Sequence, residues 1–324
     1  MTSPIFTGYH GKCHIQGIAV DKQNGYIYYS FTTKLIKSTL EGEIIGSVDG
    51  LVGHLGCIAF NEDDGCVYGS LEYKNDSIGK GILKNLQTDV RFDDAFYAVK
   101  FDVSKIDRPD MSASEVMTAV YLKEVVDDYN GVGENGALHR HGCSGIDGMT
   151  FAPHPDKNHL CLYVAYGVYG DVTRDDNDYQ VLLCYDHTKW DTKPLDQNNM
   201  HKCGPESPLD KFFVHTGNTT YGVQNLEYDK FTNCMFMAVY RGAKPNFENY
   251  LLFAVDCAIP PKTEKIGKVL SLKWDGWHFP DGSTGMYSFG DGSWLISRNF
   301  SKPEGQCAYI YHYKWDEVHP FIRQ

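Results

Sequence analysis

The chain has 324 residues and a formal net charge of −12, with 42% hydrophobic and 22% charged residues. These values are typical of a globular protein and exclude a disordered or collagen-like chain. Nucleic acids and anionic membranes need a concentrated cationic surface, and no block of Lys and Arg supplies one, so we expect neither as a partner. Glycine (32 residues) and aromatic residues (14%) are abundant, which favours short strands joined by tight turns.

Two features at the level of the whole chain predict a cytoplasmic protein. Residues 1–12 lack the basic and apolar regions of a secretory signal, and no apolar run is long enough to span a membrane. The ten cysteines include no C-x-x-C pair, and most lie in strand-like apolar runs. Reduced core thiols are therefore favoured over disulfides.

An internal repeat begins near the N-terminus. Residues 14–31 (HIQGIAVDKQNGYIYYSF) align with residues 54–71 (HLGCIAFNEDDGCVYGSL), so that His14 matches His54 and Tyr28 matches Tyr68. Each segment predicts a short strand, a turn rich in Asp, Asn or Gly, and a second strand of β-branched and aromatic residues. Three further segments begin in the same way, at 145–166, 222–242 and 283–300.

Two more strands follow each of these pairs. We expect them at 34–39 and 43–48, 96–102 and 117–126, 181–185 and 212–215, 251–256 and 268–274, and 307–315 with 318–322. No helix of the usual length is predicted. Five units of four antiparallel strands predict an all-β five-bladed β-propeller, one domain over residues 1–324 with blades starting near 14, 54, 145, 222 and 283. A pair of β-sandwich domains is the alternative.

Four long polar connections interrupt the units, at 72–94, 127–143, 167–179 and 186–210. Loops of this length in a closed domain are usually functional or disordered. We expect them to form walls around a site.

The site is expected where the innermost strands start and the second strands end, because both lie on one face of a propeller and converge on its axis. The repeat alignment places there the histidines, amides, tyrosines, carboxylates and arginines of the set His14, Gln16, His54, Asp147, Tyr221, Gln224, Asn225, Thr284, Ser30, Glu72, Tyr73, Tyr166, Arg241, Arg298 and Asn299, and the loop before the third unit adds His139, Arg140 and His141. We expect all of them to face one opening.

These residue types favour an acidic sugar as the ligand. Arginines are permanently charged planar donors that match carboxylate, sulfate or phosphate groups, and tyrosines with amides suit the apolar face and the hydroxyls of a sugar. We therefore predict substrate binding, to a uronate-containing oligosaccharide, by Gln16, Glu72, His141, Gln224, Arg241 and Arg298.

Two reactions fit this set. A glycoside hydrolase needs two carboxyl groups, and Glu72 with Asp147 is the only well-placed pair, since Glu227 lies mid-strand and is predicted to be buried or structural. A polysaccharide lyase needs a cation that holds the uronate, and a base and an acid that move protons. The residue types fit the lyase better, and the catalytic candidates for the two reactions are His14, His54, Asp147, Tyr166 and Tyr221.

Structural roles are the alternative for each of these residues. His14 and His54 can bond neighbouring backbones, Asp147 can tie down a loop, Arg241 and Arg298 can form salt bridges with Glu72 or Asp147, and His139 and His141 can be solvated. His14, His54 and His139 or His141 are also metal candidates, although no metal motif is present, so the expected cofactor is none or one divalent metal.

The opening segment resembles a known group of enzymes. His14-Ile15-Gln16-Gly17-Ile18-Ala19, then residues 26–31 (YIYYSF) and Gly53-His54, are similar to propeller rhamnosidases and rhamnose–glucuronate lyases, within the broader group of carbohydrate-active propellers that includes five-bladed glycosidases. The resemblance implies cleavage of a deoxysugar–uronate linkage, with His14 or His54 as the pocket histidine. A non-catalytic propeller that binds a sugar or a protein on its top face is the alternative.

Overall fold

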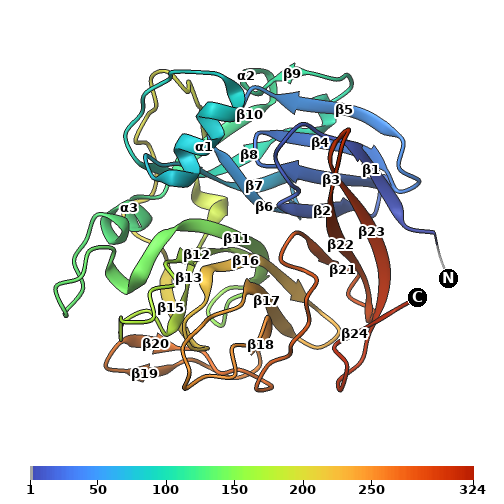
Figure 1. Cartoon of the computed structure of the whole chain (residues 1–324). Helices are drawn as coiled ribbons and strands as arrows, with labels where there is room; N and C mark the ends of the chain where they lie inside the picture. Colours follow the sequence, from blue (N-terminus) through green and yellow to red (C-terminus); the bar gives the residue numbers. More distant parts are fainter. Residues whose placement is uncertain (1–2) are drawn as a thin grey trace.

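The computed structural model describes residues 3–324 and contains five small sheets arranged in a ring around a central axis (Figure 1). Within each blade the successive strands pair antiparallel, from the axis outward. This is a five-bladed β-propeller, and the predicted fold class is confirmed. No helix within residues 3–324 is long and apolar enough to cross a membrane.

The first three blades each contain four antiparallel strands and a short addition at the outer edge. Blade 1 contains β2 (Gly17–Asp21), β3 (Tyr26–Phe31), β4 (Lys34–Thr39) and β5 (Ile44–Asp49), with β9 (Met111–Ser112) on its edge. Blade 2 contains β6 (His54–Asn61), β7 (Cys66–Tyr73), β8 (Ala95–Phe101) and β10 (Met117–Tyr121), with β14 (Lys193–Pro194) on its edge. Blade 3 contains β11 (Cys143–Pro153), β12 (Leu160–Val168), β13 (Tyr179–Tyr185) and β15 (Asp210–His215), followed by β20 (Gly267–Val269) and β19 (Lys262–Glu264).

The last two blades are less regular. Blade 4 contains β16 (Thr220–Asp229), β17 (Cys234–Tyr240) and β18 (Leu252–Asp256), and only isolated bridges at Leu272 and Trp277 extend it. Blade 5 contains β21 (Met286–Ser288), β22 (Ser293–Lys302) and β23 (Gly305–Trp315), with β1 (Ile5–Tyr9) and β24 (Phe321–Arg323) both paired to β23. The predicted fourth strand at 268–274 is therefore wrong, because its start pairs in parallel with β15 of blade 3.

The ring is closed by the N-terminal strand, which the sequence did not predict. Strand β1 lies against β23, with Ile5 opposite Ile310 and Phe6 opposite Tyr309. The expected outer strand at 318–322 is shorter, and as β24 it pairs beside β1 on the same partner. One blade thus contains both ends of the chain, which protects the edges of the ring.

Within residues 3–324 three helices interrupt the strands, and the longest of them corrects the expectation that no helix of the usual length occurs. They are α1 (Ser77–Leu86), α2 (Ala113–Val116) and α3 (Lys123–Tyr129), and short 3₁₀ turns occur at Val103–Lys105, Arg140–Gly142 and His187–Lys189. The predicted strand 117–126 ends at Tyr121 and continues into α3. Asp76 begins α1 by accepting hydrogen bonds from the N–H groups of Ile78 and Gly79, both 2.9 Å long.

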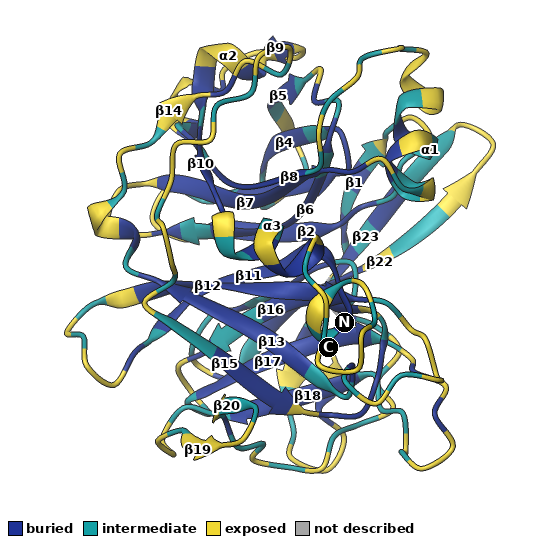
Figure 2. Cartoon of the chain, turned by 90° about the vertical axis from the view of Figure 1, so that its left-hand side faces the viewer, coloured by how far each residue is buried: buried dark blue, intermediate teal, exposed yellow. Residues whose placement is uncertain are grey.

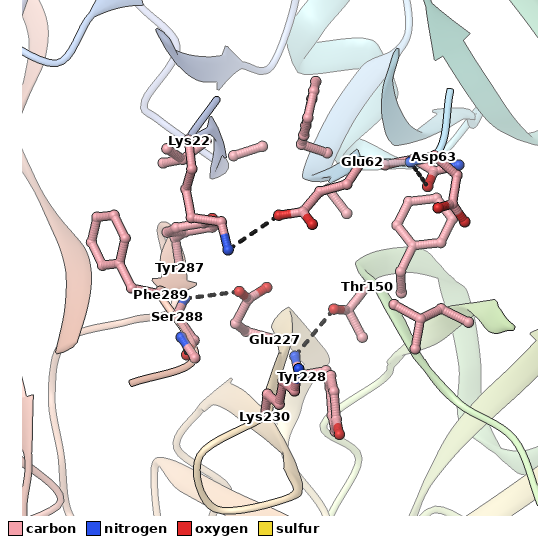
Figure 3. Close-up of a pocket in the computed structure, with 18 of the residues that line it drawn as sticks. Lys22, Glu62, Asp63, Thr150, Glu227, Tyr228, Lys230, Tyr287, Ser288 and Phe289 are labelled. Carbon is pink, nitrogen blue, oxygen red and sulfur yellow. Dashed lines mark hydrogen bonds and ion pairs between the residues drawn. The ribbon is translucent and has the colours of Figure 1, made fainter. Parts of the chain in front are cut away.

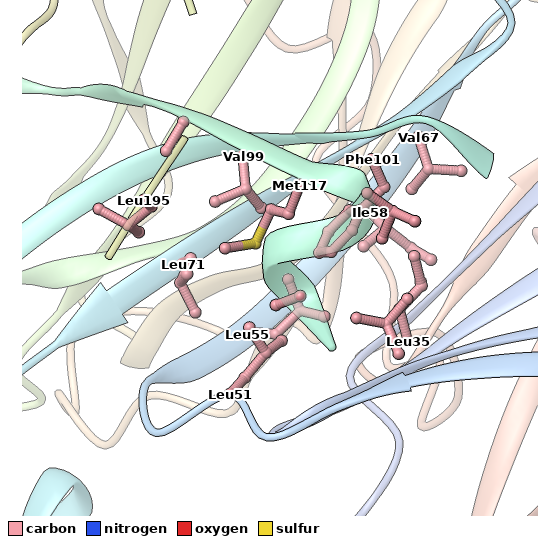
Figure 4. Packing of buried hydrophobic residues seen from close by; sticks show 14 of the residues in the cluster. Leu35, Leu51, Leu55, Ile58, Val67, Leu71, Val99, Phe101, Met117 and Leu195 are labelled. Atoms are coloured by element: carbon pink, nitrogen blue, oxygen red, sulfur yellow. The ribbon is translucent and has the colours of Figure 1, made fainter. Parts of the chain in front are cut away.

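The hydrophobic core lies between the blades. Five clusters of buried side chains each join two successive blades, and Figure 4 shows the one between blades 1 and 2. In β12, Leu162, Val164 and Tyr166 pack toward blade 2, whereas Cys161, Tyr163 and Ala165 pack toward blade 4. Alternate side chains of such a strand contact the two neighbouring blades. Because both faces are buried, consecutive residues of the strand are apolar.

Exposed residues gather in the long connections, while the strands are mostly buried (Figure 2). All ten cysteines have free thiols, and seven of them are buried. The connection 186–210 does not line the predicted site: β14 pairs with β10, and Tyr121 N donates to Cys203 O at 2.8 Å. It is a strap from blade 3 to the outer edge of blade 2, and the prediction of a site wall is wrong for it.

The inner strands approach closely at the axis. A Cβ on Gly17 would lie 2.9 Å from the Cα of Cys57, so only glycine fits between blades 1 and 2 there. Asn225, 1% exposed, donates from Nδ2 to the carbonyls of Gln16 (2.8 Å) and Ser283 (2.9 Å). Its amide therefore links blade 4 to the segments that begin blades 1 and 5.

Candidate active site

A pocket of about 230 Å³ lies at the axis, where the innermost strands start. Seven of the predicted site residues line it together: His14, Gln16, His54, Glu72, Asp147, Tyr221 and Gln224. The sequence prediction had not included Lys74, Ile78, Ser144, Ile146, Gly167 and Tyr240, which complete the lining. The repeat alignment therefore located the pocket, although it supplied only part of the wall.

Irregular pairing in the inner strands aims side chains into the pocket. The register shifts between Leu55 and Ile58 in β6, between Ile146 and Met149 in β11, and twice between Thr220 and Asn225 in β16. Such bulges bend a strand and redirect its side chains, and they are common beside active sites. Three pocket residues, Asp147, Tyr221 and Gln224, lie within these shifted segments.

Tyr221 takes an uncommon backbone conformation at the rim. Its φ is +64°, and it is 45% exposed. A bulky residue in the left-handed region is rare, and such strain is frequent at ligand sites. The ring of Tyr240 lies 6.4 Å from the Tyr221 ring, nearly perpendicular to it. The two tyrosines form an aromatic side of the pocket.

His54 lies between two carboxyl groups. Its Nδ1 is 3.5 Å from Oε1 of Glu72 and 4.0 Å from Oδ1 of Asp147. Within the described residues, both Nδ1 of His54 and Oδ1 of Asp147 are buried without a hydrogen-bond partner. Because an unpartnered buried polar atom costs free energy, this pair of atoms indicates a place for a polar group of a ligand.

Lys74 neutralises Glu72. Its Nζ lies 2.6 Å from Oε1 of Glu72 and donates to the carbonyl of Ser144 at 2.8 Å. The other carboxylate oxygen of Glu72 accepts the N–H of Ile146 at 3.1 Å. Lys74 also lies 3.6 Å from Asp76, the residue that caps α1. These contacts tie the start of α1 to the pocket, and Ile78 of α1 lines it.

Burial separates the protonation states of these groups. Desolvation raises the pKa of Asp147 well above its usual range, and the charge of Glu72 raises it further. Desolvation also raises the pKa of Glu72, although Lys74 opposes this effect and its own pKa is raised. Desolvation, with the nearby charge of Lys74, lowers the pKa of His54 to about 3. Burial therefore favours the protonated form of Asp147 and the neutral form of His54, whereas the contact with Lys74 favours the ionised form of Glu72.

Two glycines make room for the carboxyl groups. A Cβ on Gly56 would lie 2.2 Å from Oδ1 of Asp147, and a Cβ on Gly145 would lie 2.1 Å from Oε2 of Glu72. Any larger residue at either position would displace a carboxyl group. These close approaches fix the two carboxyl groups against neighbouring strands.

Four predicted pocket residues lie elsewhere. Tyr166 is fully buried between blades 2 and 3 and donates to Asp128 Oδ2 at 2.8 Å. Arg298 pairs with Asp281 at 3.0 Å, not with Glu72 or Asp147. Arg241 is exposed, and neither arginine lines the pocket. His141 packs against Phe213, with ring centroids 5.0 Å apart. It is therefore neither in the pocket nor fully solvated, the two alternatives that the sequence left open. The expectation that all the candidates face one opening is therefore wrong. Besides these four, seven other candidates do not line the pocket: Ser30, Tyr73, His139, Arg140, Asn225, Thr284 and Asn299.

The three-histidine metal set is not assembled. His139 bonds the carbonyl of Tyr129 at 2.6 Å and packs between Tyr129 and Tyr169, whereas His14 lies 3.3 Å from the amide of Gln16 in the pocket. Within residues 3–324, no group of three or more His, Cys, Asp or Glu side chains is arranged to hold a metal ion.

A signal for Lys74 was present in the sequence. It lies two residues beyond Glu72, so strand alternation sends both side chains toward the same face. Ser70, two residues before Glu72, lies on that face as well, and its hydroxyl donates to the carbonyl of Asp147 at 2.7 Å. The alternation that places Glu72 in the pocket therefore also predicts Ser70 and Lys74 on the same face of the strand. No comparable local pattern marks Tyr240 or Ile78.

No family model matches the chain, and no curated protein matches it. Solved structures with a similar chain path include a GH43 β-1,3-galactosidase with galactodeoxynojirimycin, at 11% identity and a TM-score of 0.46, covering 98% of each chain. A GH32 β-fructofuranosidase of Bombyx mori in complex with sucrose has 11% identity and a TM-score of 0.49, covering 99% of this chain and 64% of that one. A periplasmic gluconolactonase of Pseudomonas aeruginosa has 8% identity and a TM-score of 0.36, covering 95% of this chain and 70% of that one.

The first two of these belong to the broader group of propeller glycosidases, and none of the three is a rhamnosidase or a rhamnose–glucuronate lyase. At such low identity and TM-score they carry no argument about activity, so the function has to be argued from the pocket.

Proposed function

We propose that the chain is a glycoside hydrolase that removes a terminal neutral sugar, with Asp147 as general acid and Glu72 as the ionised carboxylate. The observation that carries the proposal is the arrangement of two carboxyl groups in one axial pocket, on either side of His54, with only Glu72 in contact with a lysine. Hydrolysis of a glycosidic bond uses one carboxyl group as a proton donor and a second one as nucleophile or base. Burial favours a proton on Asp147, and the ion pair with Lys74 favours the charge on Glu72.

The rest of the lining supports a sugar as the ligand. Tyr221 and Tyr240 supply aromatic faces, and Gln16 and Gln224 supply amides, which together suit the apolar face and the hydroxyls of a pyranose. The pocket volume of about 230 Å³ is below the roughly 300–1,000 Å³ of sites for drug-sized ligands. A single sugar ring at a chain end fits this size better than an internal segment of a polysaccharide.

Hydrolysis is preferred to lyase chemistry because the cations that a uronate needs are missing from the pocket lining. Arg241 and Arg298, the expected clamps, lie outside it, and Lys74 is already paired with Glu72. Tyr166, which was one of the catalytic candidates, is buried between blades. A lyase acting on a uronate is thus an outcome for the assay to detect.

The test combines a substrate panel with isosteric variants. Aryl glycosides of neutral sugars and of uronates are incubated with the wild type, Asp147→Asn, Glu72→Gln and the exposed control Arg298→Gln. We expect turnover of a neutral glycoside, a loss of about 100-fold or more in both pocket variants, and unchanged turnover in Arg298→Gln. Asp147→Asn should keep more activity on glycosides with an activated aryl leaving group, which needs no protonation, whereas a purely structural role predicts equal loss on all substrates.

Other results would decide against the proposal. An increase in ultraviolet absorbance from an unsaturated product would identify a lyase. Binding of sugars without turnover of any glycoside in the panel would identify a non-catalytic propeller. Thermal unfolding of each variant is measured alongside, so that loss of folding is not mistaken for loss of chemistry.

A further inference from the structure

A second and larger cavity lies at the opposite end of the innermost strands. Its volume is about 890 Å³, and all five blades contribute to it. The first pocket is lined by residues near the starts of β2, β6, β11 and β16, whereas this one is lined by residues further along the same strands. The two cavities therefore open on opposite faces of the ring, and the glycosidase proposal uses only the first.

Part of the wall of this second cavity is apolar and comes from three blades. Ile18 and Val20 of blade 1, Ile58 and Phe60 of blade 2, and Tyr287 and Phe289 of blade 5 line it. The rings of Tyr287 and Phe289 lie 5.2 Å apart and nearly perpendicular. Such walls suit the hydrocarbon or aromatic body of a small ligand, and their ring faces also attract a cation.

One carboxyl group lies inside these walls. Figure 3 shows Glu227 of β16 extending toward the space between Tyr287, Thr150 and the Lys22–Glu62 pair. Its Oε1 accepts the N–H of Ser288 at 2.8 Å. Lys22 lies on the other side of the space and is bound to Glu62 at 3.1 Å, an ion pair that joins blades 1 and 2. Lys22 is thus already paired with another carboxylate.

The charges around the cavity favour a cationic ligand. Besides Glu227 and the Lys22–Glu62 pair, the titratable groups that face it or lie beside it are Asp63, His159, Tyr228, Asp229, Lys230 and Tyr287. Asp229 adds negative charge on the strand that carries Glu227, and His159 is bound to Asp186 at 3.1 Å. Carboxylates outnumber lysines here, so an anion such as a phosphate or a carboxylate would be repelled.

We propose that this second cavity is a binding site for a small organic ammonium ion with an apolar or aromatic body, whose nitrogen pairs with Glu227. The apolar walls hold the body of the ligand, the aromatic rings lie around the nitrogen, and the carboxyl group supplies the counter-charge. The proposal is independent of the glycosidase, because no residue of the axial pocket takes part.

Proton release makes the proposal measurable. Desolvation raises the pKa of Glu227 to about 8, so near neutral pH the empty site holds a protonated carboxyl group. When the ammonium binds, the carboxyl O–H bond breaks, the proton passes to the solvent, and the carboxylate pairs with the cation. Affinity for an amine should therefore rise with pH until Glu227 is ionised without a ligand.

Isothermal titration calorimetry with phenethylamine, and with 2-phenylethanol as the neutral match, tests this. In two buffers of different ionisation enthalpy we expect release of up to one proton per phenethylamine and tighter binding by about tenfold between about pH 6.5 and about pH 8.5. Glu227→Gln should weaken phenethylamine by about tenfold and abolish proton release. Glu72→Gln, in the other pocket, should leave both values unchanged.

Three results would overturn the proposal. They are equal affinity for 2-phenylethanol and phenethylamine, binding of phenethylamine without proton release, and no binding of either probe. The pH series on the wild type does not depend on folding of a variant. Failure of the glycosidase assay leaves these measurements unaffected.

Discussion

Two carboxyl groups, the buried Asp147 and the half-buried Glu227, show how position changes the chemistry of one functional group. Asp147 lies at the starts of the inner strands, where a second carboxylate raises its pKa further. Glu227 lies further along, where desolvation is the main cause and Asp229 adds to it. In both, the protein environment raises the pKa of the carboxyl group and favours its protonated form.

The raised pKa of Glu227 makes a prediction about stability. In the folded protein the pKa is about 8, whereas in the unfolded chain it is about 4.3. The unfolded chain therefore binds fewer protons between these values, and the folded state loses stability as pH rises from about 4.3 to about 8. Glu227→Gln should be destabilised less by alkali, with a melting temperature equal to or above that of the wild type near about pH 9.

Differential scanning calorimetry of both proteins across this pH range measures the effect. Lys22→Gln is the matched control, since it removes a neighbouring charge and keeps the half-buried acid. Parallel stability profiles for the wild type and Glu227→Gln would contradict the assigned protonation of Glu227.

Strand β1 is the element on which closure of the ring depends. Thr7 at its centre is fully buried, and its hydroxyl donates to the carbonyl of Ala308 (3.2 Å) and accepts the N–H of the same residue (2.9 Å). These bonds join the N-terminal strand to β23 at a sequence separation of 301 residues. A local pattern in residues 5–9 does not contain this information.

Thr7→Val should lower the free energy of unfolding by about 1–3 kcal/mol, because valine keeps the shape of threonine and leaves a buried peptide group of Ala308 without its hydroxyl partner. Chemical denaturation measures the loss. Tyr9→Phe, at a residue that is 48% exposed on the same strand, should change stability by less than about 0.5 kcal/mol. Equal effects of the two substitutions would show that the hydroxyl of Thr7 does not contribute to closure.

The whole molecule contains neutral imidazoles that couple its folding to acid. Desolvation, with nearby positive charges, lowers the pKa of His54 to about 3 and that of His141 to about 4. In the unfolded chain both would titrate near about 6.5. Their contribution to stability is complete above that value and is lost as pH falls toward the folded-state pKa values.

We therefore expect His141→Gln to reduce the number of protons taken up on unfolding at about pH 5 by about one, relative to the wild type. The slope of unfolding free energy against pH gives this number. His139→Gln, in the same loop, serves as the comparison for a general effect of substitution there. An unchanged slope in His141→Gln would mean that this imidazole is already charged in the folded protein.

The sequence by itself determined the number of blades and the column of residues around the axis. The strand, turn, strand pattern repeats locally, and equivalent positions such as His14 and His54 must meet at the axis once the units form a ring. For that reason Gln16, Glu72, Asp147, Tyr221 and Gln224 also lie together in the pocket.

Only the tertiary structure decided which of the predicted residues do not line the pocket, and which segments far away in the sequence complete the pocket and the ring. Tyr166 faces a neighbouring blade because alternation within β12 turns it away from the axis, and Arg298 is held by Asp281. The contribution of α1 through Ile78, the closure by β1 and the second cavity around Glu227 each depend on contacts between segments far apart in the chain. Local periodicity fixes strands and turns, whereas these features arise from packing between blades, which no local pattern records.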